Sequence, residues 1–183
     1  MDTSSTPTRQ VRYSVAMSLD GYIAGPNGEA DWIVMDPDVD IASIYARFDT
    51  LLIGRKTYDA MKAMGGGTGE DTMMPGVTSV VFSRTMKPAD HPKLTIVSDA
   101  EPYVRDLKTK PGKDIWLWGG GELFNSLLEA GLVDGLDVGV IPVLLGGGIP
   151  LLPSPSSIAK LVLRKHRVFE KTGTVLLEYD VAR

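Results

Sequence analysis

The stretch DIWLWGGGELFNSLLEAG, residues 114–131, decides the predicted fold. Its first part, residues 114–118, is an apolar run with the length of a short buried strand. Residues 122–131 place leucines at helical spacing and end on a glycine, the usual stop signal of a helix. A strand joined to a helix by the three glycines at 119–121 predicts one repeat of a parallel sheet that is covered by helices.

The same alternation continues on both sides of this stretch. Further strands are expected at residues 11–17, 50–54, 77–83, 94–98 and 135–143, and helices at 38–48, 55–64 and 99–109. Residues 160–182 alternate, turn and return, which predicts an antiparallel hairpin. We therefore predict a single α/β domain over residues 10–183, with about eight mostly parallel strands, helices on both faces and a C-terminal hairpin. Residues 1–9 are expected to form a disordered tail.

Composition narrows the class of protein. The chain has 183 residues, of which 43% are hydrophobic and 23% charged, as in ordinary soluble domains. The net charge of −4 argues against a nucleic-acid binder, which normally carries a basic face. No run approaches the roughly 18 apolar residues of a membrane helix, and the polar N-terminus is no secretory signal. We expect a cytoplasmic protein with no membrane or nucleic-acid partner.

Metal and thiol chemistry are not expected. The chain has no cysteine, which excludes disulfides, thiolate catalysis and cysteine-ligated zinc. Its two histidines, His91 and His166, each lack a second histidine at metal-ligand spacing. We therefore assign no metal site.

Three strand-to-helix junctions carry groups that suit a phosphate, and ligands of α/β sheets bind beyond the carboxyl ends of strands. The glycines at 119–121 allow close approach to a helix N-terminus, which attracts anions. Residues 54–57, GRKT, place two cations at another helix start, where they are expected to face a bound phosphate. The alternative is a solvated helix start that tolerates the two charges. Ser83 and Arg84 end a third strand. The other glycine triplets, 65–67 and 146–148, follow a helix or lie in a loop and are expected only to turn the chain.

Three such junctions exceed what one phosphate needs, and they match a dinucleotide with an additional ribose phosphate. The sequence has neither a Walker loop nor the G-x-G-x-x-G fingerprint of an ordinary dinucleotide-binding domain. No acidic residue ends these strands to hold a ribose diol, so NADPH is favoured over NADH.

Six segments, in the family's order, resemble the dihydrofolate reductase superfamily. They are VAMSLDGYIA, GEADW, LLIGRKTYDAM, VVFSRT, WGGGELFNSLLEAGLVDGL and IPVLLGGGIPLLP. The chain is most similar to the C-terminal reductase domain of the riboflavin-biosynthesis deaminase-reductases, the RibD C-terminal domain family. The deaminase signature needs cysteines, so the resemblance implies the reductase alone.

The resemblance implies an eight-stranded sheet with NADPH across its strand ends and hydride transfer to a small heterocyclic or carbonyl substrate. The leading substrate class is that of a 5-amino-6-(5-phosphoribosylamino)uracil reductase. By motif match, the cofactor-binding residues are Ala16 and Ile23 at the nicotinamide, Gly54, Arg55, Lys56 and Thr57 at the phosphates, Ser83 and Arg84 at the adenosine, and Gly119, Gly120, Gly121 and Glu122, with Leu123, at the pyrophosphate.

Two positions depart from the riboflavin enzymes. Tyr22 stands where those reductases usually carry a basic residue, and Trp118 where they often carry a glutamate. Both differences argue against the assignment of a phosphoribosylaminouracil substrate. The GRKT junction is also more similar to that of a dihydrofolate reductase than to that of a riboflavin enzyme. A dihydrofolate or pterin reductase is therefore the enzyme alternative, and a non-catalytic nucleotide-binding protein is the other. The predicted substrate-binding residues are Asp20, Tyr22, Trp32 and Trp118.

A proton donor is expected among the carboxylates near the nicotinamide loop, Asp20, Asp31, Asp36 and Asp38. Dihydrofolate reductases place an acid a few residues after a tryptophan, at the start of the first helix. Because Trp32 precedes it, Asp36 is the predicted catalytic acid. The alternative is that Asp36 or Asp38 only caps the helix.

The segment IPVLLGGGIPLLP, residues 141–153, is apolar for exposed chain. Similar segments of the family lie near a dimer interface, so the resemblance implies a homodimer.

Overall fold

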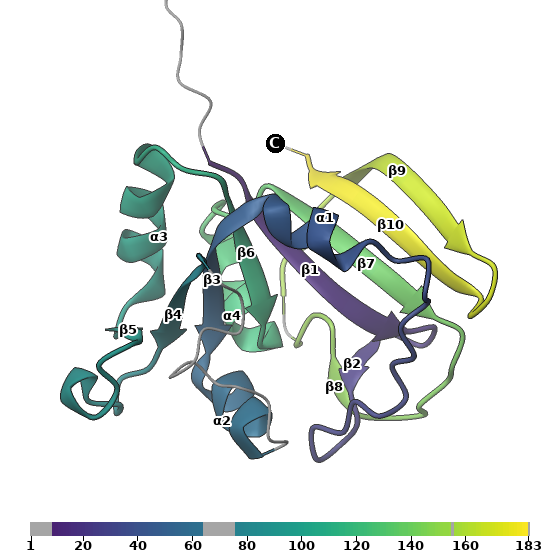
Figure 1. Ribbon diagram of the computed structural model, residues 1–183, viewed down its shortest axis with the longest axis horizontal. Helices are drawn as coiled ribbons and strands as arrows, with labels where there is room; N and C mark the ends of the chain where they lie inside the picture. The colour runs from purple at the N-terminus through teal and green to yellow at the C-terminus, as the bar shows by residue number, and fades with distance from the viewer. Residues whose placement is uncertain (1–8, 64–75, 155, 183) are drawn as a thin grey trace, which may run out of the picture.

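The computed structural model describes residues 9–63, 76–154 and 156–182, which form a single α/β domain (Figure 1). The strands are β1 (Val11–Ser18), β2 (Tyr22–Ala24), β3 (Phe48–Gly54), β4 (Thr78–Phe82), β5 (Thr95–Val97), β6 (Asp114–Gly119), β7 (Gly135–Ile141), β8 (Ile149–Pro150), β9 (Leu161–Phe169) and β10 (Thr174–Val181). The helices are α1 (Ile41–Ala46), α2 (Arg55–Ala63), α3 (Ala100–Thr109) and α4 (Gly121–Glu129), with a 3-10 turn at Pro88–Asp90.

Eight of the strands form one sheet in the order β5-β4-β3-β6-β1-β7-β10-β9. All pairs from β5 to β7 are parallel, whereas β10 pairs antiparallel with both β7 and β9. This confirms the predicted mostly parallel sheet and its C-terminal antiparallel hairpin. The short strands β2 and β8 pair with each other outside this sheet, in two segments that were expected to be loops.

Helices cover both faces of the parallel part of the sheet, as predicted. On one face, side chains such as Tyr13, Leu117 and Phe124 pack with those of α3 and α4. On the other face, a second cluster includes Leu51, Tyr58 and Trp116 and lies beneath α1 and α2. Figure 1 shows α1 and α2 in front of the sheet and α4 behind it. Alternate residues of each strand therefore enter two different cores, which explains their nearly continuous apolar sequence.

The first helix is shorter than the predicted 38–48. Asp40 caps it, because its carboxylate accepts a hydrogen bond from the backbone N–H of Ser43 at 3.0 Å. Phe48, which has helical spacing in the sequence, is instead the first residue of β3 and is 2% exposed. Its burial in the core beside Trp116 outweighs the local helical pattern.

The N-terminal boundary lies at Arg9 or before it. Residues 1–8, most of the predicted disordered tail, lie outside the described residues. Arg9 was assigned to that tail, but its side chain is 5% exposed and it pairs with the carboxylate of Asp49. It also donates a hydrogen bond to the hydroxyl of Thr50 at 2.8 Å. Arg9 therefore belongs to the domain, because the ion pair fastens it to β3.

Candidate functional site

The N-termini of α2 and α4 meet at the carboxyl ends of β3 and β6. A side chain at Gly119 would place its Cβ 3.0 Å from Thr57 Cγ2, and one at Gly120 would lie 3.4 Å from Thr57 Oγ1. Gly54 is equally close, since its Cβ would lie 3.4 Å from the carbonyl oxygen of Gly119. The structure thus brings together two of the three predicted junctions. A side chain at Gly119 would press on Thr57 and shift the start of α2, whereas Gly120 favours glycine by its φ of 87°.

The start of α4 has no side-chain cap. Gly120 is the N-cap residue, with a φ of 87° that favours glycine, and it has no side chain to accept the first N–H groups of the helix. The next glycine, Gly121, is buried, and its Cβ would lie 3.1 Å from the carbonyl oxygen of Pro150. Uncapped N–H groups with the positive end of a nine-residue helix behind them suit a phosphate.

The two cations of α2 are present at this site, and both form ion pairs. Arg55 Nε lies 2.6 Å from Asp59 Oδ2, one turn along the helix. Lys56 Nζ lies 2.9 Å from Glu122 Oε1, so this pair links the first turns of α2 and α4. Both members of the second pair are largely exposed, at 85% and 75%. Such pairs contribute little to stability, so an incoming phosphate group competes for these cations at small cost.

The third junction, after β4, is next to β3 in the sheet, because Phe82 is in register with Gly54. Ser83 is buried, and its hydroxyl accepts hydrogen bonds from the backbone N–H groups of Thr85 and Met86, at 3.2 and 3.1 Å. Ser83 therefore shapes the turn in this structure, and the neighbouring Arg84 is exposed.

Asp20 fixes the predicted nicotinamide loop, residues 18–24, to the loop that follows β7. Its carboxylate accepts hydrogen bonds from Ser18 Oγ at 2.6 Å and from the backbone N–H groups of Leu145 and Gly146 at 3.1 and 2.7 Å. The hydrogen bond from Ser18, with those from Gly146 and Leu145, lowers the pKa of Asp20 against the opposing effect of burial. Asp20, predicted to bind substrate, thus joins residues 18–24 to the loop of the third glycine triplet through two of its hydrogen bonds, those from Leu145 and Gly146.

Pairing of β2 with β8 extends this connection. Tyr22, another predicted substrate residue, is half-buried and in register with Pro150, and Ala24 is in register with Ile149. The loop after β7 therefore contacts both the nicotinamide loop and Gly121 of α4. Ala16 and Ile23, the predicted nicotinamide residues, are half-buried in β1 and β2. The third triplet was expected only to turn the chain, and its contacts with Asp20 were missed because they join residues distant in the sequence.

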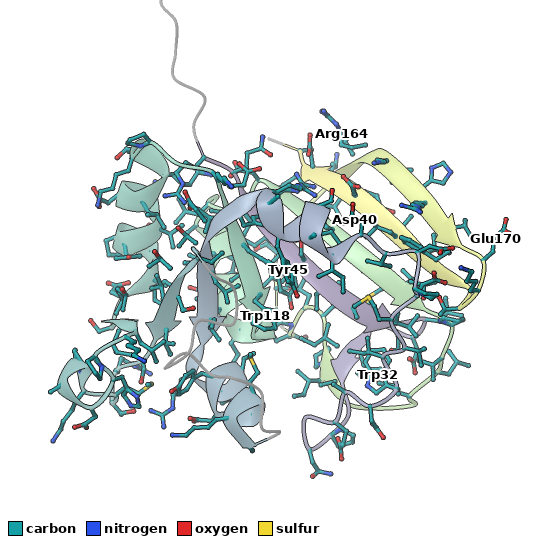
Figure 2. The ribbon with its side chains drawn as sticks, in the orientation of Figure 1. Trp32, Asp40, Tyr45, Trp118, Arg164 and Glu170 are labelled. Atoms are coloured by element: carbon teal, nitrogen blue, oxygen red, sulfur yellow. The ribbon has the colours of Figure 1, made fainter. Side chains whose placement is uncertain are left out.

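Trp118 belongs to a row of aromatic side chains on the α1 and α2 face. Its ring centroid lies 5.9 Å from that of Trp116, which in turn lies 5.5 Å from Tyr45 of α1. Trp118 is half-buried, and Tyr45 is 38% exposed. Figure 2 shows Trp118 and Tyr45 close together, with Trp32 apart from them beside β2. The structure therefore adds Tyr45 to this region and separates Trp32 from Trp118.

Asp36, the predicted catalytic acid, lies against the turn between β9 and β10. One carboxylate oxygen accepts hydrogen bonds from the N–H and the hydroxyl of Thr172, both at 3.0 Å, and the other accepts one from the N–H of Asp38 at 2.9 Å. The side chain is only 2% exposed. Burial alone would raise the pKa of Asp36, but the bonds from Asp38 and Thr172 and the charge of Lys171 lower it below its usual value. This geometry favours an ionised, structural carboxylate, and the assignment of Asp36 as proton donor stays a prediction.

The described residues contain no group of three or more histidine, aspartate or glutamate side chains placed to hold a metal ion. In the same part of the chain, no helix has the length and apolar character needed to cross a membrane.

The sheet order and the meeting of strand ends with two helix N-termini define a class, the dihydrofolate reductase-like domains. A dihydrofolate reductase from Enterococcus faecalis, solved with NADP(H), superposes with a TM-score of 0.68 over 95% of this chain and 97% of that one, at 18% identity. At this identity the similarity shows the fold alone.

Within that class, the chain belongs to the RibD C-terminal domain family, whose model matches residues 9–176. It is 34% identical to the uncharacterized protein YyaP of Bacillus subtilis (strain 168), over 97% of each chain. It is 27% identical to the riboflavin biosynthesis protein RibD of Mycobacterium tuberculosis, covering 94% of this chain and 54% of that protein.

Solved structures agree with the family. A putative riboflavin biosynthesis protein from Shewanella sp. PV-4 matches with a TM-score of 0.77 at 27% identity, over 95% of this chain and 99% of that one. Another neighbour is a diaminohydroxyphosphoribosylaminopyrimidine deaminase/5-amino-6-(5-phosphoribosylamino)uracil reductase from Thermotoga maritima, with a TM-score of 0.69 at 16% identity, and this similarity again shows the fold alone.

Proposed function

We propose that this protein is an NADPH-dependent reductase of the riboflavin-biosynthesis type, which transfers a hydride to a small heterocyclic or carbonyl substrate. The observation that carries the proposal is the meeting of Thr57 with Gly119 and Gly120. This contact places the uncapped start of α4 beside the two cations of α2. Family membership and a neighbouring structure solved with NADP(H) support the same cofactor.

The described residues fit such a cofactor. Gly119, Gly120 and Gly121 leave space that a Cβ would fill, and their helix end suits the pyrophosphate. Arg55 and Lys56 suit a 2′-phosphate, because each would exchange an exposed carboxylate partner for a phosphate. When bound, NADPH supplies the hydride. The chain's own part is to orient the nicotinamide through Ala16 and Ile23 and to hold the surrounding loops in place.

For the substrate, we propose a flat ring that lies near Trp118. Trp118 and Tyr45, which the buried Trp116 connects, offer partly exposed aromatic surface near the end of β6. A 5-amino-6-(5-phosphoribosylamino)uracil-like substrate is the leading class. The aromatic row also favours a pterin, which is the second candidate. For Asp36 we propose the role of proton donor, directly or through an ordered water, while its hydrogen bonds fix residues 32–40 against the β9–β10 turn.

A thermal-shift comparison of NADPH with NADH tests the cofactor. Ligand at a hundredfold excess over its Kd stabilises the folded state by about 2.7 kcal/mol, so NADPH should raise the Tm more than NADH. Arg55→Ala should remove most of that difference. Arg105→Ala is the matched control, since Arg105 also forms a solvent-exposed ion pair one turn apart, with Glu101 of α3. Equal shifts for both cofactors, before and after substitution, would refute the phosphate assignment.

Catalysis is tested separately, by following the loss of NADPH absorbance in the presence of pyrimidine or pterin substrates. The signal comes from the reduced nicotinamide, so the same assay serves every candidate substrate. Turnover of either class identifies the substrate. Tight NADPH binding without turnover of any candidate would instead favour the nucleotide-binding alternative. The cytoplasmic location and the homodimer expected from the sequence stay proposals.

A further inference from the structure

Glu178 of β10 lies on the same face of the sheet as α1 and Trp118. The next residue, Tyr179, packs against the core formed with α3 and α4, so Glu178 points to the opposite side. Its register partner on β7 is Asp137, whose Oδ2 lies 3.5 Å from Nη1 of Arg47, the C-cap residue of α1. Glu178 therefore belongs to the face on which the flat ring of the substrate is proposed to lie.

The carboxylate of Glu178 has unused capacity to accept hydrogen bonds. Among the described residues, its side chain has one polar partner, Lys165, whose Nζ lies 3.9 Å from Oε1 and is thus too far away for a hydrogen bond. The Glu178 side chain is nevertheless only 21% exposed, whereas that of Lys165 is 68% exposed. The neighbouring Asp137, by contrast, accepts hydrogen bonds from Arg12 and Ser14. A carboxylate in the state of Glu178 suits a ligand that brings donors to it.

Two small residues separate Glu178 from Trp118. Ala16 of β1, a predicted nicotinamide residue, is in register with Gly139 of β7, which is in register with Leu176 of β10. A Cβ at Gly139 would have its nearest described atoms 4.0 Å away, so nothing there crowds this position. Glu178 lies diagonally across from Gly139, at about 7–8 Å, within reach of a long side chain. Because β1 and β7 lie between β6 and β10, roughly 14 Å is available for a ring between Trp118 and Glu178.

The segment that joins the predicted nicotinamide loop to α1 carries only negative charge. Residues 22–46 contain no lysine, arginine or histidine, and their five carboxylates are Glu29, Asp31, Asp36, Asp38 and Asp40. The cations nearest to this segment are engaged, since Arg47 lies beside Asp137 and Lys171 pairs with Asp38 at 2.7 Å. The surroundings therefore favour a ligand edge rich in N–H donors over one that presents oxygen atoms.

We propose that Glu178 determines the specificity of the site, by accepting a hydrogen bond from an amino group of a flat heterocycle that lies over Ala16 and Gly139. The inference rests on the proposed reductase function, because the nicotinamide at Ala16 sets where the ring must lie. The substrate class is a ring with an amino group at the edge toward β10. An oxo group at that edge would instead oppose its lone pairs to those of the carboxylate.

Calorimetric binding of pterin and of lumazine to the full chain, saturated with NADP⁺, tests the proposal. The two probes share one bicyclic ring system, and lumazine carries an oxo group where pterin carries its amino group. The oxidised cofactor prevents turnover during the measurement. The wild type should bind pterin at least about tenfold more tightly than lumazine, and Glu178→Gln should remove most of this preference.

Lys165→Gln is the matched control, because it removes the same ion pair from the other side. An exposed pair contributes little to stability, so both variants should keep the Tm of the wild type. Lys165→Gln should change the ratio of the two affinities less than about twofold. If Glu178→Gln does not fold by circular dichroism, Glu178→Asp, which withdraws the carboxylate by one methylene group, should reduce the preference in its place.

Three outcomes would overturn the proposal. They are an equal change of the affinity ratio in both variants, a ratio in Glu178→Gln that equals that of the wild type, and a wild type that does not prefer pterin or does not bind it up to about 1 mM. The NADPH thermal shift of the same proteins separates this inference from the reductase proposal. If the shift is present, these outcomes refute the role of Glu178 alone, whereas its absence in the wild type refutes the cofactor assignment.

Discussion

The glycines at 119–121 lie between a strand and a helix, whereas those at 146–148 lie in a loop that Asp20 holds. Gly119 is needed because Thr57 lies so close that a side chain would displace it. Gly147 has no neighbouring atom within 4 Å of the position that a Cβ would take. Identical tripeptides thus hide different requirements from position to position, close approach at Gly119 and Gly148 and no constraint from neighbouring atoms at Gly147, and single alanine substitutions separate them.

The largest effect is expected from Gly148→Ala, at the end of the loop triplet. Its φ is 148°, and a Cβ would overlap the carbonyl oxygen of Ala24, which is backbone and has little room to move. We expect a loss of about 2–3 kcal/mol in the free energy of unfolding, measured with urea. A loss below about 0.5 kcal/mol would show that β2 and β8 are not held together in solution as they are here.

Gly119→Ala should have the next largest effect. The new Cβ would lie 3.0 Å from Thr57 Cγ2, so the start of α2 must shift, at a cost of about 1–2 kcal/mol. The variant should also lose most of the NADPH thermal shift. Thr57→Ser removes the obstructing methyl group, so the double variant should recover stability. No recovery would place the strain elsewhere.

Asp20→Asn tests the attachment of the loop triplet by its pH dependence. The pKa of Asp20 is lowered in the folded protein, so its contribution to stability is present above the unfolded value near about 3.9 and is lost as the pH falls through the folded pKa. The difference in unfolding free energy between wild type and variant should therefore shrink as the pH is lowered from about 7 to about 3. A difference that is constant with pH would contradict a role for the charge.

Gly147→Ala should have the smallest effect, within about 0.5 kcal/mol of wild type. It is the matched control for Gly119→Ala, since each glycine has a backbone conformation open to alanine and only Gly119 has a close neighbour. The NADPH thermal shift should be unchanged. A large loss in this variant would remove the distinction between Gly119 and Gly147.

The main sheet was predictable because each of its strands is a local apolar run, or in the C-terminal hairpin an alternating one, next to a helix or a turn. The β2–β8 pair was not, since two or three residues carry no periodicity and their pairing joins distant segments. Asp20 and Gly146 are likewise 126 residues apart. Local sequence patterns contain no information about such partners.

The candidate site divides in the same way. The phosphate junctions were predictable from glycines and cations at the ends of strands, and the structure brings residues 54–57 and 119–121 together. The state of Asp36 was not predictable. Its position after Trp32 indicates only that a carboxylate lies near the predicted nicotinamide loop. Its proton affinity depends in part on Thr172, which lies 136 residues away in the sequence.

The position of β1 in the middle of the sheet has a consequence for biosynthesis. Gln10, just before β1, bonds with Asp114, 104 residues later, and β1 has its second neighbour only when β7 is complete at Ile141. At roughly 5–20 residues per second, the ribosome exposes an apolar first strand for several seconds before either partner emerges. Chaperones that bind extended apolar segments therefore have a defined period in which to act on this chain, which closes when β6 and β7 enclose β1.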